Sequence, residues 1–247
     1  MADRIKIRIG GDAAGPVVAG DGNIVESHRS GPAAAAGRTP HAPPTTAALT
    51  AMDSASEYRA LMAVDVERSA GRGNLAMQTV RDALFSALRE SFTRSGIAWE
   101  DCLRDDLGDG IRVTMPADAQ KITLIHPLAH ELALRLCAHN RLAGPPTQIR
   151  VRIALHAGDV RIEQTGTVTG RPLEVLARML DAPPARNALA NAPESVPAVV
   201  LVSQHFYDET VGHGYPGIDP EMFHNVTFTV KEYTANAWLH LPLRAIA

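Results

Sequence analysis

The order of apolar periodicities after residue 58 constrains the fold of this chain more than any other feature. Continuous apolar runs predict buried strands, whereas apolar side chains repeated every three to four residues predict helices. The predicted elements are a strand over 61–65, a helix over 74–95, a strand pair around 108–110, a helix over 118–139 and a strand over 149–157. This β-α-β-β-α-β order predicts an α+β fold with a ferredoxin-like sheet and helices on one face.

A C-terminal αβ extension follows this predicted core. Its expected elements are a returning strand over 160–164, a helix from Pro172 to Asp181, a strand over 199–202, a short helix over 206–211, and strands over 226–231 and 235–241. Within the core, Pro127 interrupts the second helical pattern and predicts a kink or a break. The fold alone names no function, because this architecture hosts many.

Composition divides the chain before residue 58. Residues 27–57 are rich in Ala, Pro, Ser and Thr and poor in branched apolar side chains, so they predict a disordered linker. Residues 1–26 alternate briefly and then turn at repeated glycines, which predicts a small docking element for a protein partner. We therefore expect the folded domain to span residues 58–247.

The gross charge excludes some classes of function. The formal net charge is −3, so no overall basic field favours nucleic acid. The two cysteines, Cys102 and Cys137, match no zinc motif, and the N-terminus lacks the apolar core of a signal peptide. No apolar run has the length of a membrane span. A cytoplasmic protein is the expectation.

Two carboxylates carry the first chemical signal. Asp65 ends a buried strand, where a charge is costly unless it is paired or binds a metal. Asp109 lies between Gly108 and Gly110, which permit a tight turn and close approach of a ligand. Each residue alone also fits a purely structural role, Asp65 as a helix cap and Asp109 as a turn residue. Because the first strand and the hairpin are neighbours in a ferredoxin-like sheet, the pair predicts a Mg²⁺ or Mn²⁺ site facing a nucleoside triphosphate.

Five motifs follow one another along the chain: the strand ending at Asp65, the Leu-Gly-Asp-Gly-Ile hairpin at 107–111, the Arg-Ile-Ala-Leu-His-Ala-Gly strand at 152–158, the Val-Leu-Ala-Arg-Met helix at 175–179, and Val230-Lys231. In this order they resemble the catalytic domain of class III nucleotidyl cyclases, in a divergent, standalone form of the actinobacterial type. Each motif is weak alone, but the series covers residues 58–242.

The resemblance implies a role for each matching residue. Asp65, Asp109 and the backbone carbonyl of Val66 would hold two Mg²⁺ or Mn²⁺ ions. Arg178 would stabilise charge in the transition state, and Lys231 would hold the triphosphate. The resemblance also implies a homodimer with composite active sites, in which one subunit supplies the aspartates and the other supplies the arginine and the lysine.

Two departures from the family pattern concern catalysis. Glu174 occupies the position of the family's transition-state asparagine, one helical turn before the catalytic arginine, and its charge would repel a triphosphate. The glycine-rich turn after the first strand arrives late, so we expect phosphate contacts from Arg68, Ser69 and Arg72 instead. These departures leave two readings open. One is an active cyclase, and the other is a cyclase-like domain that binds nucleotide or scaffolds a partner without turnover.

The base-recognition positions are also unusual. Asp105 stands four residues before Asp109, where family members typically carry Lys for ATP or Glu for GTP, and Thr167 takes the partner position. A carboxylate accepts from the imino and amino groups of guanine but offers nothing to N1 of adenine. The sequence therefore favours GTP or a pyrimidine triphosphate over ATP. The His126/His130 pair is interrupted by Pro127, so we assign no transition metal.

Overall fold

The computed structural model describes residues 56–242 of the 247-residue chain. The predicted docking element at 1–26 and the predicted linker up to residue 55 lie outside the described residues. Ser56 and Glu57, which the sequence places in the linker, belong to the first strand. Within residues 56–242, no helix combines the length and apolarity needed to cross a membrane.

The first part of the domain is the predicted ferredoxin-like core. Its elements are β1 (Ser56–Val66), α2 (Asn74–Arg94), β2 (Leu103–Asp106), β3 (Gly110–Thr114), α3 (His130–Leu142) and β4 (Val151–Ile162). The strands lie in the order β2-β3-β1-β4, and every neighbouring pair is antiparallel. The β-α-β-β-α-β order is therefore confirmed.

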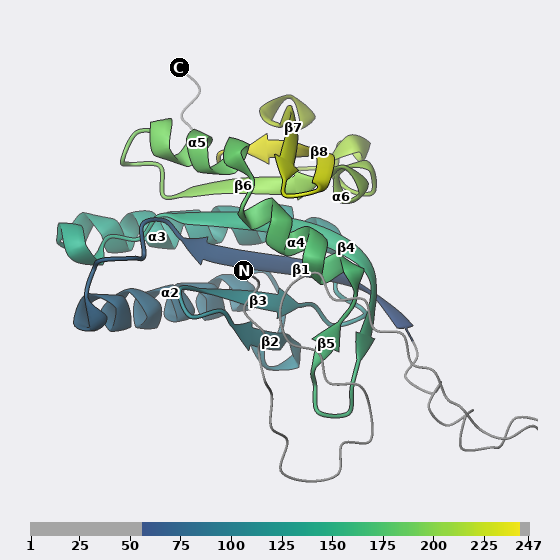
Figure 1. Cartoon of the computed structure of the whole chain (residues 1–247), viewed down its shortest axis with the longest axis horizontal. Coiled ribbons are helices and arrows are strands. Elements are labelled where there is room, and N and C mark those ends of the chain that lie inside the picture. The colour runs from purple at the N-terminus through teal and green to yellow at the C-terminus, as the bar shows by residue number, and fades with distance from the viewer. Residues whose placement is uncertain (1–55, 243–247) are drawn as a thin grey trace, which may run out of the picture. The chain divides into compact units, whose positions relative to one another are not determined.

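The extension widens the same sheet. Its elements are β5 (Val168–Thr169), α4 (Arg171–Leu180), α5 (Pro183–Asn191), β6 (Ala198–Ser203), α6 (Gln204–Asp208), β7 (His224–Val230) and β8 (Tyr233–His240). β6 runs parallel to β4, and β8 and β7 follow as an antiparallel hairpin at the far edge (Figure 1). β5 pairs with β4 and completes an eight-stranded sheet.

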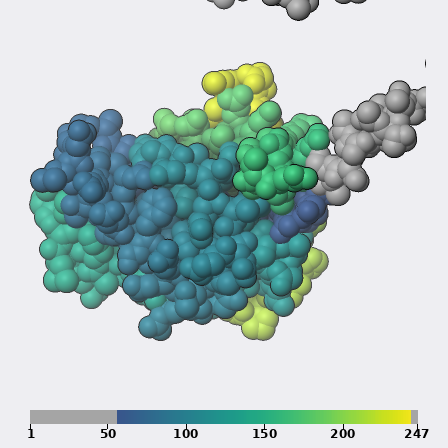
Figure 2. Space-filling view, turned by 90° about the horizontal axis from the view of Figure 1, so that it is seen from below, coloured from purple at the N-terminus to yellow at the C-terminus, as the bar shows by residue number. Residues whose placement is uncertain are grey.

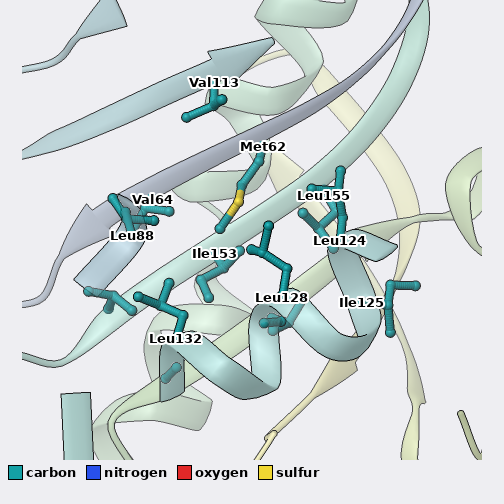
Figure 3. Close-up of a cluster of buried hydrophobic side chains, with 14 of the residues drawn as sticks. Met62, Val64, Leu88, Val113, Leu124, Ile125, Leu128, Leu132, Ile153 and Leu155 are labelled. Atoms are coloured by element: carbon teal, nitrogen blue, oxygen red, sulfur yellow. The ribbon is translucent and has the colours of Figure 1, made fainter. Parts of the chain in front are cut away.

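Helices α2 and α3 cover one face of the sheet. Alternate residues of the central strands, such as Met62, Val113 and Ile153, point toward them, and Leu88 and Leu132 meet these side chains from the helices (Figure 3). All five side chains are at most 1% exposed. Figure 2 looks at the domain from below, where the blue and teal segments, which include α2, form most of the surface. This face holds the larger of the two apolar clusters.

The opposite face carries a second layer of helices. Leu173, Leu176 and Met179 of α4 and Leu189 of α5 pack there against the other side of the central strands. The expected arrangement of helices on one face thus holds for α2 and α3 of the core, while α4 and α5 of the extension cover the other face (Figure 1). The α4 layer matters for function, because Asp65 points to the same side of β1 as Leu61 and Ala63.

Three elements differ from the sequence prediction. Regular helix in the second helical segment begins only at His130, after single turns over 121–124 and 125–129, because His126 is extended before Pro127. β4 continues through Ile162, so residues 160–164 do not form a returning strand, and that role falls to β5. α5 was not predicted, since its Ala-rich sequence has only a weak apolar period.

Candidate functional site

The register of β1 with its two neighbours brings the two predicted metal ligands together. Asp65 is opposite Gly110 of β3, and the Val66 N–H donates to the Asp109 carbonyl at 3.1 Å. A Cβ on Gly110 would lie 2.1 Å from the carbonyl oxygen of Val64 and 3.1 Å from Cα of Asp65. Only glycine allows this approach, since side chains cannot share space with a neighbouring backbone. The hairpin glycine therefore sets the spacing of the two aspartates.

The Asp65 carboxylate is enclosed and paired. It faces Arg152, its register partner on β4, in an ion pair whose side chains are only 16% and 15% exposed. Burial raises the pKa of Asp65, and the nearby charge of Asp109 adds to that rise, while Arg152 opposes it. The Nε atom of Arg152 is buried without a hydrogen-bond partner in the described structure. Two neighbouring carboxylates and one under-satisfied guanidinium thus converge at this end of the sheet.

The loop after β1 supports the second aspartate. The hydroxyl of Ser69 donates to Oδ2 of Asp109 at 2.7 Å. Arg68 is exposed and has a φ of 53°, in the left-handed region that non-glycine residues rarely adopt. Of the three predicted phosphate contacts, Ser69 therefore already has a role in orienting Asp109, and Arg68 points its charge at solvent.

Arg72 is used differently from the prediction. Its guanidinium donates to the backbone carbonyls of Glu67, Pro146 and Gln148, and its Nε donates to the carbonyl of Arg68. Burial lowers the pKa of Arg72. These bonds tie the loop after β1 to the loop before β4, and they leave the guanidinium little capacity for a phosphate.

A polar pocket of about 210 Å³ lies beside this loop. Arg68 and Arg72 line it together with Arg150, which forms an ion pair with Glu67 at 3.2 Å. Arg150 also donates to carbonyls in the segment between α5 and β6. Two of the three guanidinium groups that line the pocket, those of Arg72 and Arg150, therefore already have partners.

The predicted arginine and lysine form a second group. Arg178 lies in the last turn of α4 and donates from Nη2 to Oε1 of Glu232 at 3.0 Å. Glu232 is the neighbour of Lys231 in the turn between β7 and β8. Glu174 is exposed on α4 and forms no ion pair within residues 56–242.

The two groups are separate within one chain. No hydrogen bond or ion pair in the described part of the chain joins Asp65 or Asp109 to Arg178 or Lys231. The cations that act on the pKa of Asp65 are Arg152 and Arg186 of α5. We call the Asp65–Asp109 group the acidic half-site and the Arg178–Lys231 group the basic half-site.

The predicted base-recognition residues lie on the edge of the sheet. Asp105 accepts from Nε and Nη2 of Arg112, its cross-strand partner on β3, at 3.0 and 2.9 Å. Gly166 directly precedes Thr167, and a Cβ placed on Gly166 would lie 3.8 Å from Cδ2 of Leu103. The β4–β5 hairpin thus approaches β2, where Asp105 is located. Asp105 is an ion-paired carboxylate, which its sequence position did not reveal.

Sequence reasoning missed Arg152, Arg112 and Glu232. Arg152 was part of a matching strand but received no role, because only the register places it against Asp65. His156, in the same strand, donates or accepts at Nδ1 with the Ser203 hydroxyl at 2.8 Å, and burial lowers its pKa to about 4. It is far along β4 from Arg152 and belongs to the packing of the sheet.

Comparisons with known proteins identify the fold. No protein-family model matches the chain, and no curated protein matches it in sequence. Among solved structures, the guanylyl cyclase Cya2 is 15% identical, with a TM-score of 0.54 over 75% of this chain and 92% of the other. An adenylate/guanylate cyclase/hydrolase from Silicibacter pomeroyi is 17% identical, with a TM-score of 0.55 over 76% and 98%.

A bacterial light-regulated adenylyl cyclase is 10% identical, with a TM-score of 0.54 over 78% of this chain and 54% of the other. Identities this low establish the fold and leave activity open. The chain has the fold of class III adenylate/guanylate cyclase catalytic domains, as its motifs predicted.

Proposed function

We propose that this protein is a cytoplasmic nucleotidyl cyclase, which converts a nucleoside triphosphate to a 3′,5′-cyclic nucleotide and pyrophosphate for intracellular signalling. The observation that carries the proposal is the pairing of Asp65 with the Asp109 hairpin inside a domain of cyclase fold. In the reaction the ribose 3′-oxygen attacks the α-phosphorus, and the bond from that phosphorus to the pyrophosphate oxygen breaks.

The residues at this end of the sheet fit two Mg²⁺ or Mn²⁺ ions. Mg²⁺ is bound in nucleotide enzymes by one or two carboxylates, with substrate phosphates completing its shell. Asp65 and Asp109 supply such a pair, and the Val66 carbonyl is the third protein ligand in the proposal. Within residues 56–242 no group of three His, Cys, Asp or Glu side chains is placed to hold a metal ion, and in the proposal the nucleotide contributes the remaining ligands. When bound, the ions acidify the 3′-hydroxyl and neutralise the leaving group.

The acidic half-site has residues to orient its ligands. Ser69 fixes one oxygen of Asp109, which leaves the other free to face a cation. Arg152 forms an ion pair with Asp65 and offsets its charge. With Asp65 serving as a metal ligand, Arg152, whose Nε lacks a partner, would be available to donate to a phosphate oxygen. Arg68 lies at the rim of the same loop and serves as a second phosphate contact in the proposal.

The basic half-site supplies the remaining charges. In the proposal, Arg178 stabilises charge on the α-phosphate in the transition state and Lys231 binds the outer phosphates. No hydrogen bond or ion pair within residues 56–242 joins the two half-sites, and in the proposal a homodimer joins the acidic half of one subunit to the basic half of the other. Glu174 is exposed on α4. In the proposal it stays exposed in the dimer, so its negative charge does not face the phosphates that Arg178 binds.

The proposed substrate is GTP or a pyrimidine triphosphate. Asp105 supplies an acceptor for the imino group of guanine or uracil, while its other oxygen is held by Arg112. Thr167 adds a hydroxyl from the nearby hairpin. Arg112 brings hydrogen-bond donors to this edge, and a donor can bond to N1 of adenine. We therefore expect weaker discrimination against ATP than an isolated carboxylate would give.

A second candidate is a cyclase-like domain without turnover, which binds nucleotide or scaffolds a partner. The exposed Glu174 favours it, since an acidic group one turn before Arg178 adds negative charge where phosphates would gather. Both readings predict binding of a metal–nucleotide complex. Only the first predicts product.

The decisive experiment is incubation of the purified protein with each of the four nucleoside triphosphates and Mn²⁺, with cyclic nucleotides detected by mass spectrometry. We expect cyclic GMP or a cyclic pyrimidine nucleotide. Nucleotide binding without product from any of the four would leave the second candidate standing and remove the first.

Mixing two inactive variants tests the composite site. Asp65→Ala loses an acidic half-site and Arg178→Ala loses a basic one, so each homodimer is inactive. A mixed dimer contains one site with both intact halves, and we expect up to a quarter of wild-type activity after random re-pairing. Size-exclusion chromatography must show that both variants still associate; folded, mixed dimers without activity would contradict the shared site.

A further inference from the structure

The partner of Arg178 is not the one that its own helix offers. Glu174 precedes Arg178 by four residues on α4, an acid-before-base spacing that favours ion pairs within a helix. In the structure Nη2 of Arg178 instead donates to Oε1 of Glu232, 54 residues away, at 3.0 Å. The guanidinium is therefore directed off the helix toward the turn between β7 and β8.

That turn is short and fixed on both sides. β7 and β8 remain paired up to Val230 and Tyr233, so Lys231 and Glu232 alone make the connection. Lys231 has a φ of 53°, as the first residue of a tight two-residue hairpin turn requires. Phe228 of β7 lies in the same buried cluster as Met179 of α4. The positions of the helix and the turn are thus tied together through the core.

From these contacts we infer that Glu232 is a positioning residue that holds Arg178 beside Lys231, so that both cations face one triphosphate. This inference rests on the proposed function. Glu232 engages a single guanidinium nitrogen, and within residues 56–242 the Nε and Nη1 atoms of Arg178 make no hydrogen bond. Those two groups are left for phosphate oxygens. A guanidinium ordered before substrate arrives loses less conformational freedom in the transition state.

The test compares Glu232→Ala and Glu232→Gln with the control Glu100→Gln. Glu100 is an exposed acid in the short helix at 99–101, outside both half-sites. Exposed ion pairs contribute up to about 1 kcal/mol, which corresponds to a two- to fivefold change. We expect Glu232→Ala to lower kcat/KM by about two- to fivefold, because a less ordered Arg178 binds both the triphosphate and its transition state more weakly. Glu232→Gln keeps an oxygen acceptor and should fall between, and Glu100→Gln should match wild type.

Two further measurements separate positioning from other roles. In an Arg178→Lys background, Glu232→Ala should add no further loss of kcat/KM, because the residue acts through the guanidinium. Calorimetric titration with Mn²⁺ and tripolyphosphate gives a readout that does not depend on turnover, and Glu232→Ala should bind about two- to fivefold more weakly.

The kinetic and binding results for Glu232→Ala test the positioning role directly. Wild-type kinetics and binding in Glu232→Ala overturn the inference, and so does tighter binding or a higher kcat/KM, which would make Glu232 a restraint on Arg178. If wild type forms no cyclic nucleotide but Glu232→Ala still weakens tripolyphosphate binding, the proposed cyclase activity fails while the positioning role stands.

Discussion

Substitution of Gly110 by alanine tests the central feature of the candidate site. The added Cβ would lie 2.1 Å from the Val64 carbonyl oxygen, well inside a normal carbon–oxygen contact. Both atoms belong to backbone, so no side-chain rotation relieves the clash, and β3 has to move from β1 by about 1 Å. Overpacking in well-packed regions costs about 1–3 kcal/mol. We expect a loss near the upper end, about 3 kcal/mol in the free energy of unfolding.

Urea denaturation measures this loss, and thermal melting gives a second readout. For a domain of this size about 3 kcal/mol corresponds to a fall in Tm of about 6–12 °C. Gly108→Ala is the matched control. Gly108 has a φ of 89° but nothing within 4 Å of an added Cβ, so it reports backbone strain without a clash. We expect about 1 kcal/mol there.

Gly110→Ala should also weaken Mn²⁺ binding, because the displaced hairpin carries Asp109 away from Asp65. A loss of stability at Gly110 no larger than at Gly108, or Mn²⁺ affinity equal to wild type in the folded variant, would refute the argument that this glycine sets the spacing of the two carboxylates.

Two other predictions concern Ser69 and His156. Ser69→Ala removes the hydroxyl donor that orients Asp109. Loss of such a hydrogen-bond partner of a metal ligand should weaken Mn²⁺ binding by about tenfold in calorimetric titration, while Ser69→Thr should retain most of the affinity. Equal Mn²⁺ affinity in wild type and the alanine variant would contradict this role. Burial lowers the pKa of His156 to about 4, so the unfolded chain binds its proton first, and stability should fall by on the order of 3 kcal/mol as the pH decreases from about 6.5 to 4. His156→Gln should flatten this part of a pH series of urea denaturations, and an unchanged slope would show that other groups control it.

The sequence predicted the fold well where elements have a strong period. The apolar face of α2 repeats through Val80, Leu84 and Leu88, and the predicted boundaries of this helix agree with the structure to one residue. The helix predicted for the segment before α3 does not form, because Pro127 disfavours helical backbone in the residue before it. His126 is extended there, despite the helical spacing of the apolar side chains. The sequence did not predict α5, because its apolar side chains repeat only weakly. Its buried side chains include small ones such as Ala185, which tertiary packing covers.

For the candidate site, the sequence predicted that Asp65 and Asp109 lie together but not which side chains pair with them. Asp65 and Asp109 could be placed together because the core topology makes β1 and the hairpin neighbours. Their partners could not, since an ion pair between β1 and Arg152 depends on the register of β4, and a period of two leaves several registers open. Arg72 shows the same limit: its sequence position suggests phosphate binding, whereas the fold surrounds it with carbonyl oxygens.

Backbone strain supplies an independent argument for anion binding. Within residues 56–242, the non-glycine residues with positive φ are Arg68 and Lys231, and both are basic. A left-handed conformation costs an ordinary residue about 1–2 kcal/mol, which glycine would avoid. One of these residues borders the acidic half-site and the other belongs to the basic half-site. The two-residue turn accounts for the conformation of Lys231, and since strained residues are often found at functional sites, both positions support the proposal that these cations contact phosphate. A triphosphate bridging the two half-sites would meet both.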